Sequence, residues 1–534
     1  MFEHPGRLTR IFFAMKIILA YISGLSNRND PYISLLPTGL TYLHACLQEA
    51  GYDSVLVNFS GWSSARIEQE LQAIKPDVVG ISQWTHNRHS SLDLASRCRR
   101  LFPASTVIMG GGHATFCYEE LLADGSPVDC VVIGEGELTL LELAERAGRQ
   151  SGWQDINGVA FRRDGKVVVT AVRSPLSNLD QLPMPARHLE HSIGLDKELQ
   201  LEFIVTARGC PSACLFCSSP AFWGNKIRFR SAQAIVDEIE YIRNQFGLIY
   251  FSIRDDTFTA DRRRALEFCS TLVDRRANIL WNCQSRVTAI DEELVIMMKR
   301  AGCECIQLGV ESGSPRILRK LGKNILPTQV ERASALIRET GINLSIYLIS
   351  DIPGETEDDI RQTIELVRHI HPDDGYVSPL AYYPGTQLYK NALAAGNTTS
   401  SIFADKHHAA LYAASRPGHS SSHLLRELTN NQQDNPERFK MQKRRLGYCY
   451  TTNVIAGEWH RNRGEFNKAE REFSEITVLQ PDNPWGWFLL GDLYTELGKI
   501  KKGRDFYTKV LSIVPKHGPS IEAIAAVKKT GPFA

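Results

Sequence analysis

The chain has 534 residues and a formal net charge of +1, from 61 basic and 60 acidic side chains. This length predicts roughly three to four domains, and the near-zero charge argues against a general attraction to nucleic acid or anionic membranes. No run reaches about 18 apolar residues, so we expect no transmembrane helix. Most of the 12 cysteines, Cys46 and Cys130 among them, lie singly in apolar stretches, as free thiols do in a reducing cytoplasm.

Residues 15–150 predict a doubly wound α/β domain. The apolar run at 11–22 resembles a signal peptide, but Lys16 interrupts it and no cleavage site follows. We therefore interpret it as a strand, with Met15 as a candidate start of the protein. The predicted strands are 16–21, 53–58, 77–82, 106–109 and 128–133, and the predicted helices are 38–50, 65–74 and 91–101. This alternation indicates a parallel sheet with helices on both faces, which binds ligands at the carboxyl ends of its strands.

The loops at those strand ends are rich in glycine. Gly110-Gly111-Gly112-His113 follows the fourth strand and Gly134-Glu135-Gly136-Glu137 follows the fifth. Glycines let a backbone approach a large ligand closely. Neither loop has the G-x-G-x-x-G pattern, so dinucleotide binding is not favoured. Ser82 ends the third strand, and Trp84 and His86 follow it, either facing a ligand or serving as ordinary loop residues.

Residues 151–195 predict a hairpin and a proline-rich linker. An apolar run at 201–206, which we interpret as a buried strand, then leads into Cys210, Cys214 and Cys217, spaced C-x3-C-x2-C. Three thiolates cannot saturate a four-iron cubane, so one iron would stay open for another ligand. A structural zinc site would need a fourth ligand, usually from a second knuckle, and none is nearby. A disulfide fits an intracellular chain poorly.

Residues 196–390 predict an open barrel of six βα units. After the strand at 201–206, further strands are expected at 248–253, 280–284, 305–310, 342–349 and 375–379. The expected helices are 232–246, 262–275, 291–301, 328–340 and 357–369. Such a barrel carries its chemistry at the carboxyl ends of the strands.

Several of those strand ends carry charged or polar side chains. Asp255 and Asp256 follow the second strand, where paired acids can hold an ammonium group, or else cap the next helix. Arg286 follows the third strand and suits bidentate contact with a carboxylate. Glu311 and Ser312 end the fourth strand, and a buried glutamate there would be costly without a partner.

The cysteine spacing, with Phe216 directly before Cys217, resembles the radical S-adenosylmethionine (SAM) superfamily. The resemblance implies a [4Fe-4S] cluster on the three cysteines and SAM on its open iron, with Phe216 among the residues that contact SAM. It assigns Asp255 or Asp256 to the SAM amino group and Glu311-Ser312 to the ribose. Arg286 is a suitable partner for the SAM carboxylate. Asp351 stands where the family often has glycine, which leaves the adenine contact at that strand end open.

Joined to such a barrel, residues 15–145 resemble the cobalamin-binding domain of B12-dependent radical SAM enzymes. The similarity rests on the stretch 76–82 and the two glycine loops. The resemblance implies cobalamin contacts at Ser82, Trp84, His86, Gly111, Gly112, His113, Gly134 and Glu135. The D-x-H-x-x-G motif, whose histidine binds cobalt in other B12 proteins, is absent from this sequence, so a histidine ligand to cobalt is not implied.

The remaining sequence predicts an extension of helices and loops at 391–448, polar and at the surface over 400–440, and helical repeats at 449–534. His407-His408 has the appearance of a metal site, but a solvated pair is the simpler interpretation. A 34-residue spacing places Gly457 over Gly491 and Pro481 over Pro515, and resembles tetratricopeptide (TPR) repeats. Two repeats are fewer than usual for independent stability, so we expect them to pack on the barrel or on the preceding helices, either docking a protein partner or closing the barrel's open side.

The sequence therefore predicts a cytoplasmic B12-dependent radical SAM enzyme, with an N-terminal doubly wound domain, a partial (β/α)6 barrel and an α-helical C-terminal region. Its expected reaction is methyl transfer to an unactivated carbon of a small molecule or natural product, driven by a flavodoxin- or ferredoxin-like reductant. One alternative is radical cyclisation without methyl transfer, as in the anaerobic porphyrin-ring cyclases of the family. An alternative of another class is a non-catalytic scaffold that binds partners through the repeats.

Overall fold

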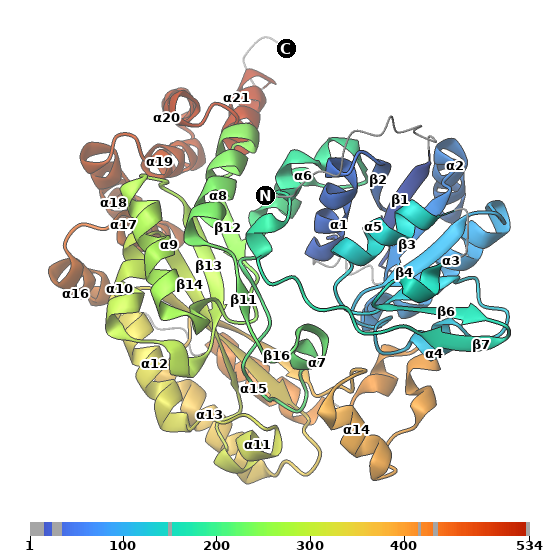
Figure 1. The fold of residues 1–534 in the computed structure, drawn as a ribbon. Coiled ribbons are helices and arrows are strands. Elements are labelled where there is room, and N and C mark those ends of the chain that lie inside the picture. The colour runs from blue at the N-terminus through green and yellow to red at the C-terminus, as the bar shows by residue number, and fades with distance from the viewer. Residues whose placement is uncertain (1–14, 24–34, 148–151, 415–417, 431–435, 530–534) are drawn as a thin grey trace. The chain divides into compact units, whose positions relative to one another are not determined.

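A computed structural model describes residues 15–23, 35–147, 152–414, 418–430 and 436–529 (Figure 1). The chain divides into two compact units. Unit 1 comprises Met1–Ser177, Gln181–Gln200 and Phe403–His408, and unit 2 comprises Asn178–Asp180, Leu201–Ile402 and Ala409–Ala534. Within the described residues no helix is both long and apolar enough to span a bilayer.

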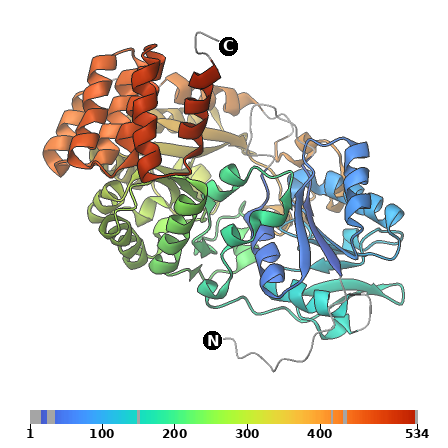
Figure 2. The same ribbon diagram turned by 90° about the horizontal axis from the view of Figure 1, so that it is seen from above.

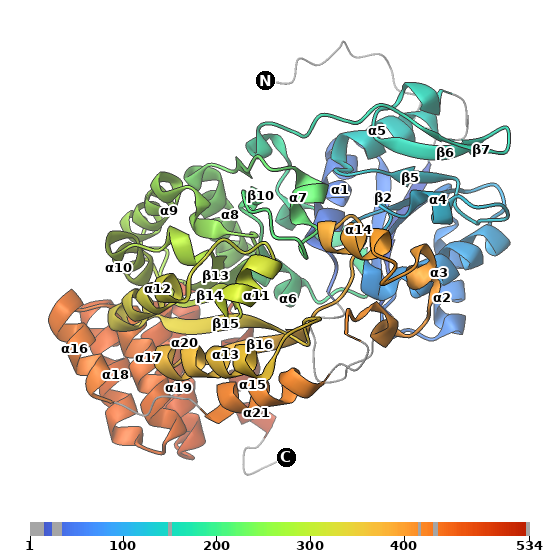
Figure 3. The same ribbon diagram turned by 90° about the horizontal axis from the view of Figure 1, so that it is seen from below.

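Unit 1 is built on an eight-stranded sheet with the order β7-β6-β5-β4-β3-β1-β2-β8. The strands are β1 (Lys16–Tyr21), β2 (Asp53–Asn58), β3 (Val78–Ser82), β4 (Thr106–Gly110), β5 (Cys130–Val132), β6 (Val159–Arg163), β7 (Lys166–Val169) and β8 (Ser192–Ile193). Strand β6 alone runs against the others, antiparallel to both β5 and β7; it forms with β7 a hairpin at the sheet edge that Figure 3 shows beside β5. Helices α1 (Thr38–Glu49) and α5 (Glu137–Arg146) pack together, as do α2 (Ser64–Ile74) and α3 (Arg88–Leu101).

The predicted doubly wound sheet is confirmed, and its strand order creates a switch point. Both β2 and β3 pair with β1, so the chain reverses its direction across the sheet between β1 and β3. Ligands of doubly wound sheets bind at the carboxyl ends of strands beside such a point. Helix α5 was not predicted from the sequence; it begins at Glu137, directly after the second glycine loop.

Unit 2 contains a six-stranded parallel sheet with the order β16-β15-β14-β13-β12-β9. Its strands are β9 (Phe203–Ile204), β12 (Tyr250–Ile253), β13 (Leu280–Ser285), β14 (Cys303–Glu311), β15 (Asn343–Ser350) and β16 (Asp374–Pro379). The helices along it are α8 (Ala232–Phe246), α9 (Arg262–Asp274), α10 (Glu292–Arg300), α12 (Pro327–Thr340) and α13 (Glu357–Ile370). Because β9 and β16 do not pair, the barrel is open, as predicted.

The strand predicted at 201–206 is wrong over most of its length. Residues Lys197–Glu202 form helix α6, and β9 keeps only Phe203 and Ile204. The chain leaves the sheet after Ile204 because the backbone N–H groups of Thr206 and Ala207 donate to Asp255, at 2.6 and 2.9 Å. A carboxylate from the next strand end thus replaces the ladder hydrogen bonds that a longer strand would make.

The C-terminal helices pack in sequence, each against the next. They are α17 (Tyr450–Asn462), α18 (Phe466–Leu479), α19 (Pro484–Glu496), α20 (Ile500–Ile513) and α21 (Gly518–Lys529), stacked side by side in Figure 2. Gly491 allows close packing because a Cβ there would lie 2.6 Å from the Tyr507 ring. Their core includes Ile249 and Leu280 of the barrel, so the helices rest on the barrel as expected. Their assignment as TPR repeats stays a prediction.

The extension at 391–448 is less polar than predicted. Helices α15 (His419–Asn430) and α16 (Glu437–Leu446) bury Leu424, Leu428 and Phe439. Figure 3 shows α15 alongside α13 and strands β15 and β16. These helices therefore belong to the packed body of unit 2.

Candidate functional site

The three cysteines lie on a loop between β10 (Ala207–Arg208) and α7 (Ser219–Trp223). Leu215 anchors this loop, because its N–H donates to Leu321 O at 2.9 Å and its carbonyl accepts from Leu388 N at 2.7 Å. Gly322 has φ +68°, and a Cβ there would lie 2.9 Å from the Leu215 side chain. Phe216 packs on the small core that contains Leu321. The barrel core thus sets the shape of the loop.

The three thiols are close enough to influence one another. The pKa of Cys217 is raised to about 11, chiefly by burial, with smaller contributions from the charges of Asp256, Cys214 and Cys210. Burial also raises the pKa of Cys214, against the lowering effect of Lys323 and Arg286. Bound iron would favour the thiolate forms.

The donor set suits a cluster better than a single metal ion. Among the described residues, no three His, Cys, Asp or Glu side chains converge as the ligands of one ion would. A cubane does not require such convergence, because each thiolate binds a different iron. The three thiols of one loop therefore fit a [4Fe-4S] cluster that keeps one iron open.

Glu311 ends strand β14 in an unusual backbone conformation. Its φ is +66°, a left-handed value that costs a non-glycine residue energy. The side chain is 9% exposed, and one carboxylate oxygen accepts from Lys323 Nζ at 2.7 Å. A Cβ at Gly309 would lie 2.8 Å from both groups, so glycine at 309 leaves room for the pair. No sequence motif singled out Lys323, whose positive charge also lowers the pKa of Cys214 against the rise caused by burial.

In unit 1 a hydrogen bond joins the ends of β1 and β3, beside the switch point. Tyr21, the last residue of β1, shares a hydrogen bond of 2.7 Å with Nε2 of His86, which follows β3. Burial lowers the pKa of His86 to about 4, with a smaller effect from His408. The imidazole is therefore neutral at pH 7. Trp84, two residues earlier, is 38% exposed.

The two glycine loops lie on the same edge. Gly111 has φ +103°, and a Cβ there would lie 2.6 Å from Gln83 O and 3.3 Å from the Ser82 hydroxyl. A Cβ at Gly112 would lie 3.0 Å from the Trp84 ring, whereas one at Gly134 would meet nothing within 4 Å. These strand ends therefore present bare backbone to a ligand, which suits a large cofactor.

Comparison with known proteins agrees with both sites. A B12 binding domain model matches residues 33–144, and a radical SAM superfamily model matches residues 204–367. An uncharacterized methyltransferase of Pyrococcus horikoshii is 30% identical over 363 residues, which cover 67% of this chain and 78% of that protein. The chain belongs to the B12-binding branch of the radical SAM superfamily.

Other similar proteins match between 66% and 97% of this chain. The anaerobic magnesium-protoporphyrin IX monomethyl ester cyclase of Rubrivivax gelatinosus is 29% identical, over 66% of this chain and 66% of that protein. The solved structure of OxsB, a cobalamin-dependent radical enzyme, has a TM-score of 0.59 at 15% identity and covers 97% of this chain and 81% of that one. TsrM from Kitasatospora setae has a TM-score of 0.60 at 20% identity, over 72% of this chain and 77% of that one.

The protein is therefore a radical SAM enzyme whose cofactors are a [4Fe-4S] cluster, SAM and cobalamin. The predicted SAM-site residues fall into two groups. Arg286 and Glu311 lie near the cysteine loop, since the charges of both affect the pKa of Cys214. Asp256 joins them, because its charge raises the pKa of Cys217. Asp255 and Ser312 instead form hydrogen bonds within the fold.

The paired-acid prediction needs correction, because the two carboxylates face different ways. Asp255 is 1% exposed; its oxygens accept hydrogen bonds from Thr206 and Ala207, and one of them lies 3.7 Å from the Arg264 guanidinium. Burial raises its pKa, against the lowering effect of Arg264. Asp256 is exposed and accepts from the Ser219 hydroxyl. The capping alternative is also wrong, because Asp261 caps α9.

Ser312 is also committed to the fold. Its hydroxyl lies 3.1 Å from Thr363 Oγ1 and accepts from Ser314 N at 3.1 Å. Asp351 has φ +54°, a left-handed backbone conformation that glycine adopts more easily than other residues. Burial opposes ionisation of Asp351, but hydrogen bonds from Ser421 and Ser420 outweigh it and lower the pKa.

A segment distant in sequence, Phe403–His408, belongs to unit 1 and lies against its ligand edge. Buried Arg88 donates to Phe403 O at 2.7 Å and to Thr85 O at 2.8 Å. The Phe403 ring meets the His113 ring edge-on at 5.4 Å. Burial lowers the pKa of His113 to about 3. The sequence carried no local signal for this packing.

The two histidines of that segment do not form a metal site with their neighbours among the described residues. His407 is exposed, whereas His408 is half-buried and lowers the pKa of His86. The prediction of a solvated pair therefore holds for His407 only.

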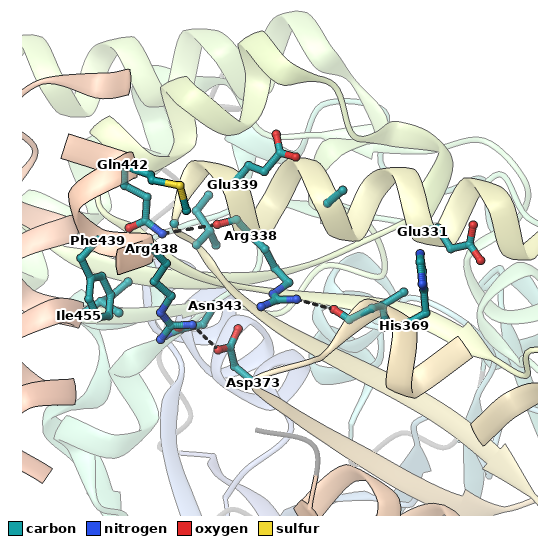
Figure 4. Close-up of a pocket in the computed structure, with 15 residues that line it drawn as sticks. Glu331, Arg338, Glu339, Asn343, His369, Asp373, Arg438, Phe439, Gln442 and Ile455 are labelled. Atoms are coloured by element: carbon teal, nitrogen blue, oxygen red, sulfur yellow. Dashed lines mark hydrogen bonds and ion pairs between the residues drawn. The ribbon is translucent and has the colours of Figure 1, made fainter. Parts of the chain in front are cut away.

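A cavity of about 290 Å³ lies at the other end of the barrel sheet (Figure 4). Arg438 of α16 pairs with Asp373 at 3.1 Å, and Arg338 donates to Ile370 O at 3.0 Å. Asp373 precedes β16, so the cavity is at the amino-terminal ends of the strands. That end of a barrel usually serves stability, and we assign these contacts to the attachment of α16.

Proposed function

We propose that this enzyme transfers a methyl group to an unactivated carbon of a small-molecule substrate. The observation that carries the proposal is the presence, in one chain, of the three-thiol loop beside the Glu311–Lys323 pair and of a cobalamin-type ligand edge. Relatives named as methyltransferases, including the hopanoid C-3 methylase of Methylococcus capsulatus at 28% identity, support it.

The residues beside the cysteine loop take separate roles in this proposal. Cys210, Cys214 and Cys217 hold the cluster. Glu311 accepts hydrogen bonds from the SAM ribose, and Lys323 holds that carboxylate in place. Arg286 receives the SAM carboxylate, as its bidentate geometry favours.

The other end of SAM and the loop packing complete the site. Asp256 receives the amino group, while Asp255 supports the loop after β9 and Phe216 packs beneath the cluster. When bound, the cluster and SAM supply a radical that removes a hydrogen atom, and methylcobalamin supplies the methyl group.

The cobalamin lies, in our proposal, along the carboxyl edge of unit 1. The glycine loops admit the cofactor close to the backbone, and the neutral imidazoles beside them add no charge to that edge. The proposed contact residues are Ser82, Trp84, His86, Gly111, Gly112, His113, Gly134 and Glu135.

Reconstitution under anaerobic conditions tests the proposal. The protein should bind about four irons and one cobalamin, cleave SAM to 5′-deoxyadenosine under a strong reductant, and move a deuterated methyl group from SAM to reduced cobalamin. Both products are followed by mass spectrometry. The control C214A should lose the cluster and, with it, the formation of 5′-deoxyadenosine. Protein with both cofactors that never labels cobalamin would reject methyl transfer.

A second candidate is radical cyclisation or rearrangement without methyl transfer. The similarity to the Rubrivivax gelatinosus cyclase favours it. Product mass separates the two functions, because methylation adds one CH2 unit and cyclisation does not. Labelled methyl from SAM should appear in the product only in the first case.

We further propose that a flavodoxin- or ferredoxin-like protein supplies the electrons. The substrate is a small molecule or natural product. The C-terminal helices offer a surface to a protein partner in this proposal, and a pull-down with α17–α21 intact or surface-substituted tests it. Cluster reduction by a purified flavodoxin, followed by loss of visible absorbance, tests the electron donor.

A further inference from the structure

The inner face of the barrel sheet in unit 2 is polar, whereas its outer face is apolar. Strand register places Gln307 beside Ser345, and Tyr347 beside both Gly309 and Tyr376. Alternate residues of the same strands, such as Leu308 and Ile346, are fully buried beneath the helices. Gln307 and Tyr347 are partly exposed, so this polar face is accessible to a ligand.

The lowest level of the inner face satisfies its own hydrogen bonds. Ser252 Oγ donates to Asn282 Oδ1 at 2.7 Å, and Asn282 Nδ2 donates to the Tyr250 hydroxyl at 2.7 Å. That hydroxyl donates to Glu304 at 2.8 Å, which also accepts from Asn343. A closed network of this kind needs no ligand.

One level higher, the network is incomplete. Gln307 Oε1 and Ser345 Oγ are buried and have no hydrogen-bond partner within the described part of the chain. Such groups cost free energy unless a ligand or water completes them. The Gln307 oxygen accepts only, so its missing partner must be an N–H or O–H donor.

Above these two groups stands an aromatic wall, formed by Tyr347 and Tyr376. Their rings are stacked with centroids 5.2 Å apart and planes 20° apart. Tyr376 lies on the edge strand β16 and is 48% exposed. A flat conjugated ring placed on this wall would extend the stack, as offset aromatic pairs prefer.

A cation lies within electrostatic range of the wall. Arg254 follows β12, and its positive charge lowers the pKa of Tyr347 against the larger rise that burial causes. Arg254 is exposed and rests on the Phe203 ring at 4.6 Å. No ion pair within 4 Å joins it to a carboxylate among the described residues, although its charge also opposes the burial-driven rise in the pKa of Glu202.

We propose that the substrate is a flat, conjugated molecule with an anionic group and an N–H or O–H donor. Its ring stacks on the wall of Tyr347 and Tyr376, its anion faces Arg254, and its donor meets Gln307. The inference rests on the proposed function, because it takes the barrel interior as the substrate side. It adds a substrate class that neither the fold nor the cofactors specify.

A binding titration with carbazole-3-carboxylate tests this assignment. The probe is flat, anionic, fluorescent and carries one N–H group. Two matched compounds separate the contributions: adamantane-1-carboxylate keeps the charge without the flat ring, and carbazole-3-carboxamide keeps the ring without the charge. The protein is the full chain, loaded with cluster and cobalamin, without reductant, with and without SAM.

We expect carbazole-3-carboxylate to bind and adamantane-1-carboxylate to bind at least tenfold more weakly. Y376L should weaken carbazole-3-carboxylate about tenfold, while Y376F, which keeps the ring, should leave it unchanged. R254Q should weaken the binding of carbazole-3-carboxylate about threefold and abolish the preference for the carboxylate over the carboxamide. The control R263Q, on the exposed start of α9, should change nothing.

Three results would overturn the inference. One is equal binding of the flat and the non-planar anion, and another is unchanged binding in Y376L. The third is displacement of the probe by SAM, which would indicate that the SAM adenine, and not the substrate, stacks on Tyr347 and Tyr376. None of these depends on SAM cleavage or cobalamin methylation, so failure here and failure of the proposed function can be told apart.

Discussion

Replacing Lys323 by methionine should destabilise the end of β14 sharply. Methionine keeps the length and apolar character of the lysine stem, so the main loss is the charge that faces Glu311. Lys323 Nζ and Glu311 Oε1 are 2.7 Å apart, and the two side chains are only 14% and 9% exposed. K323M therefore leaves a buried carboxylate without its cation, on a residue whose backbone is already left-handed.

The expected magnitude follows from the burial of the pair. Removing one partner of a buried ion pair costs about 3–5 kcal/mol, because the remaining charge stays desolvated. Some water reaches both groups, so we take the lower end, about 3 kcal/mol. That loss in the free energy of local opening corresponds to roughly a 100-fold faster amide exchange.

Hydrogen exchange followed by mass spectrometry measures this directly on peptides that cover β14 and the segment to Lys323. The double variant E311Q/K323M should recover much of the protection, since it leaves no unpaired charge. K320M is the matched control, because Lys320 is exposed and its ammonium contacts only the Pro353 carbonyl in the described structure. Exchange in K323M that matches the wild type would refute the reasoning.

Three further predictions concern the cofactors and pH. C214A should lower bound iron from about four per chain to near zero, which elemental analysis measures; retained iron would place the cluster elsewhere. G111A should lower the free energy of unfolding of unit 1 by at least about 1–2 kcal/mol, because of the left-handed backbone, and further because of the contact with Gln83 O. Unit 1 should then unfold at a lower temperature, and cobalt uptake should fall. Because burial lowers the pKa of His86 to about 4 and of His113 to about 3, the unfolded chain binds more protons below about pH 6.5. Stability should therefore be retained above pH 6.5 and lost as pH falls toward 4; a urea midpoint that does not change between pH 7.5 and 5 would contradict this.

Local signals predicted most of the elements and the placement of the three cysteines on one loop. Helix α8 begins and ends where the sequence indicated, because the Ser231 side chain caps its first turn and Gly247 ends it with φ +80°. The cysteine spacing is equally local, since three thiols within eight residues must share one loop. Periodicity and capping act over one or two turns of chain, so a sequence displays them directly.

Contacts between distant segments were beyond such reasoning. Nothing near Asp255 indicated that its carboxylate would capture Thr206, turn the chain out of the sheet and separate it from Asp256. Nor did any pattern place Phe403 against His113 of unit 1. These outcomes depend on which groups the packed core brings within hydrogen-bond distance.

The sequence by itself therefore determined the α/β class, the order of the units and the three thiols, because each depends on residues that are neighbours in the chain. Tertiary structure decided which charged groups lie beside the three thiols. Lys323 lies twelve residues beyond Glu311, and its ammonium is needed because folding buries most of that carboxylate and removes most of its water. The identity of a buried charge's partner is settled by where the chain folds back on itself, and short-range sequence patterns do not carry that information.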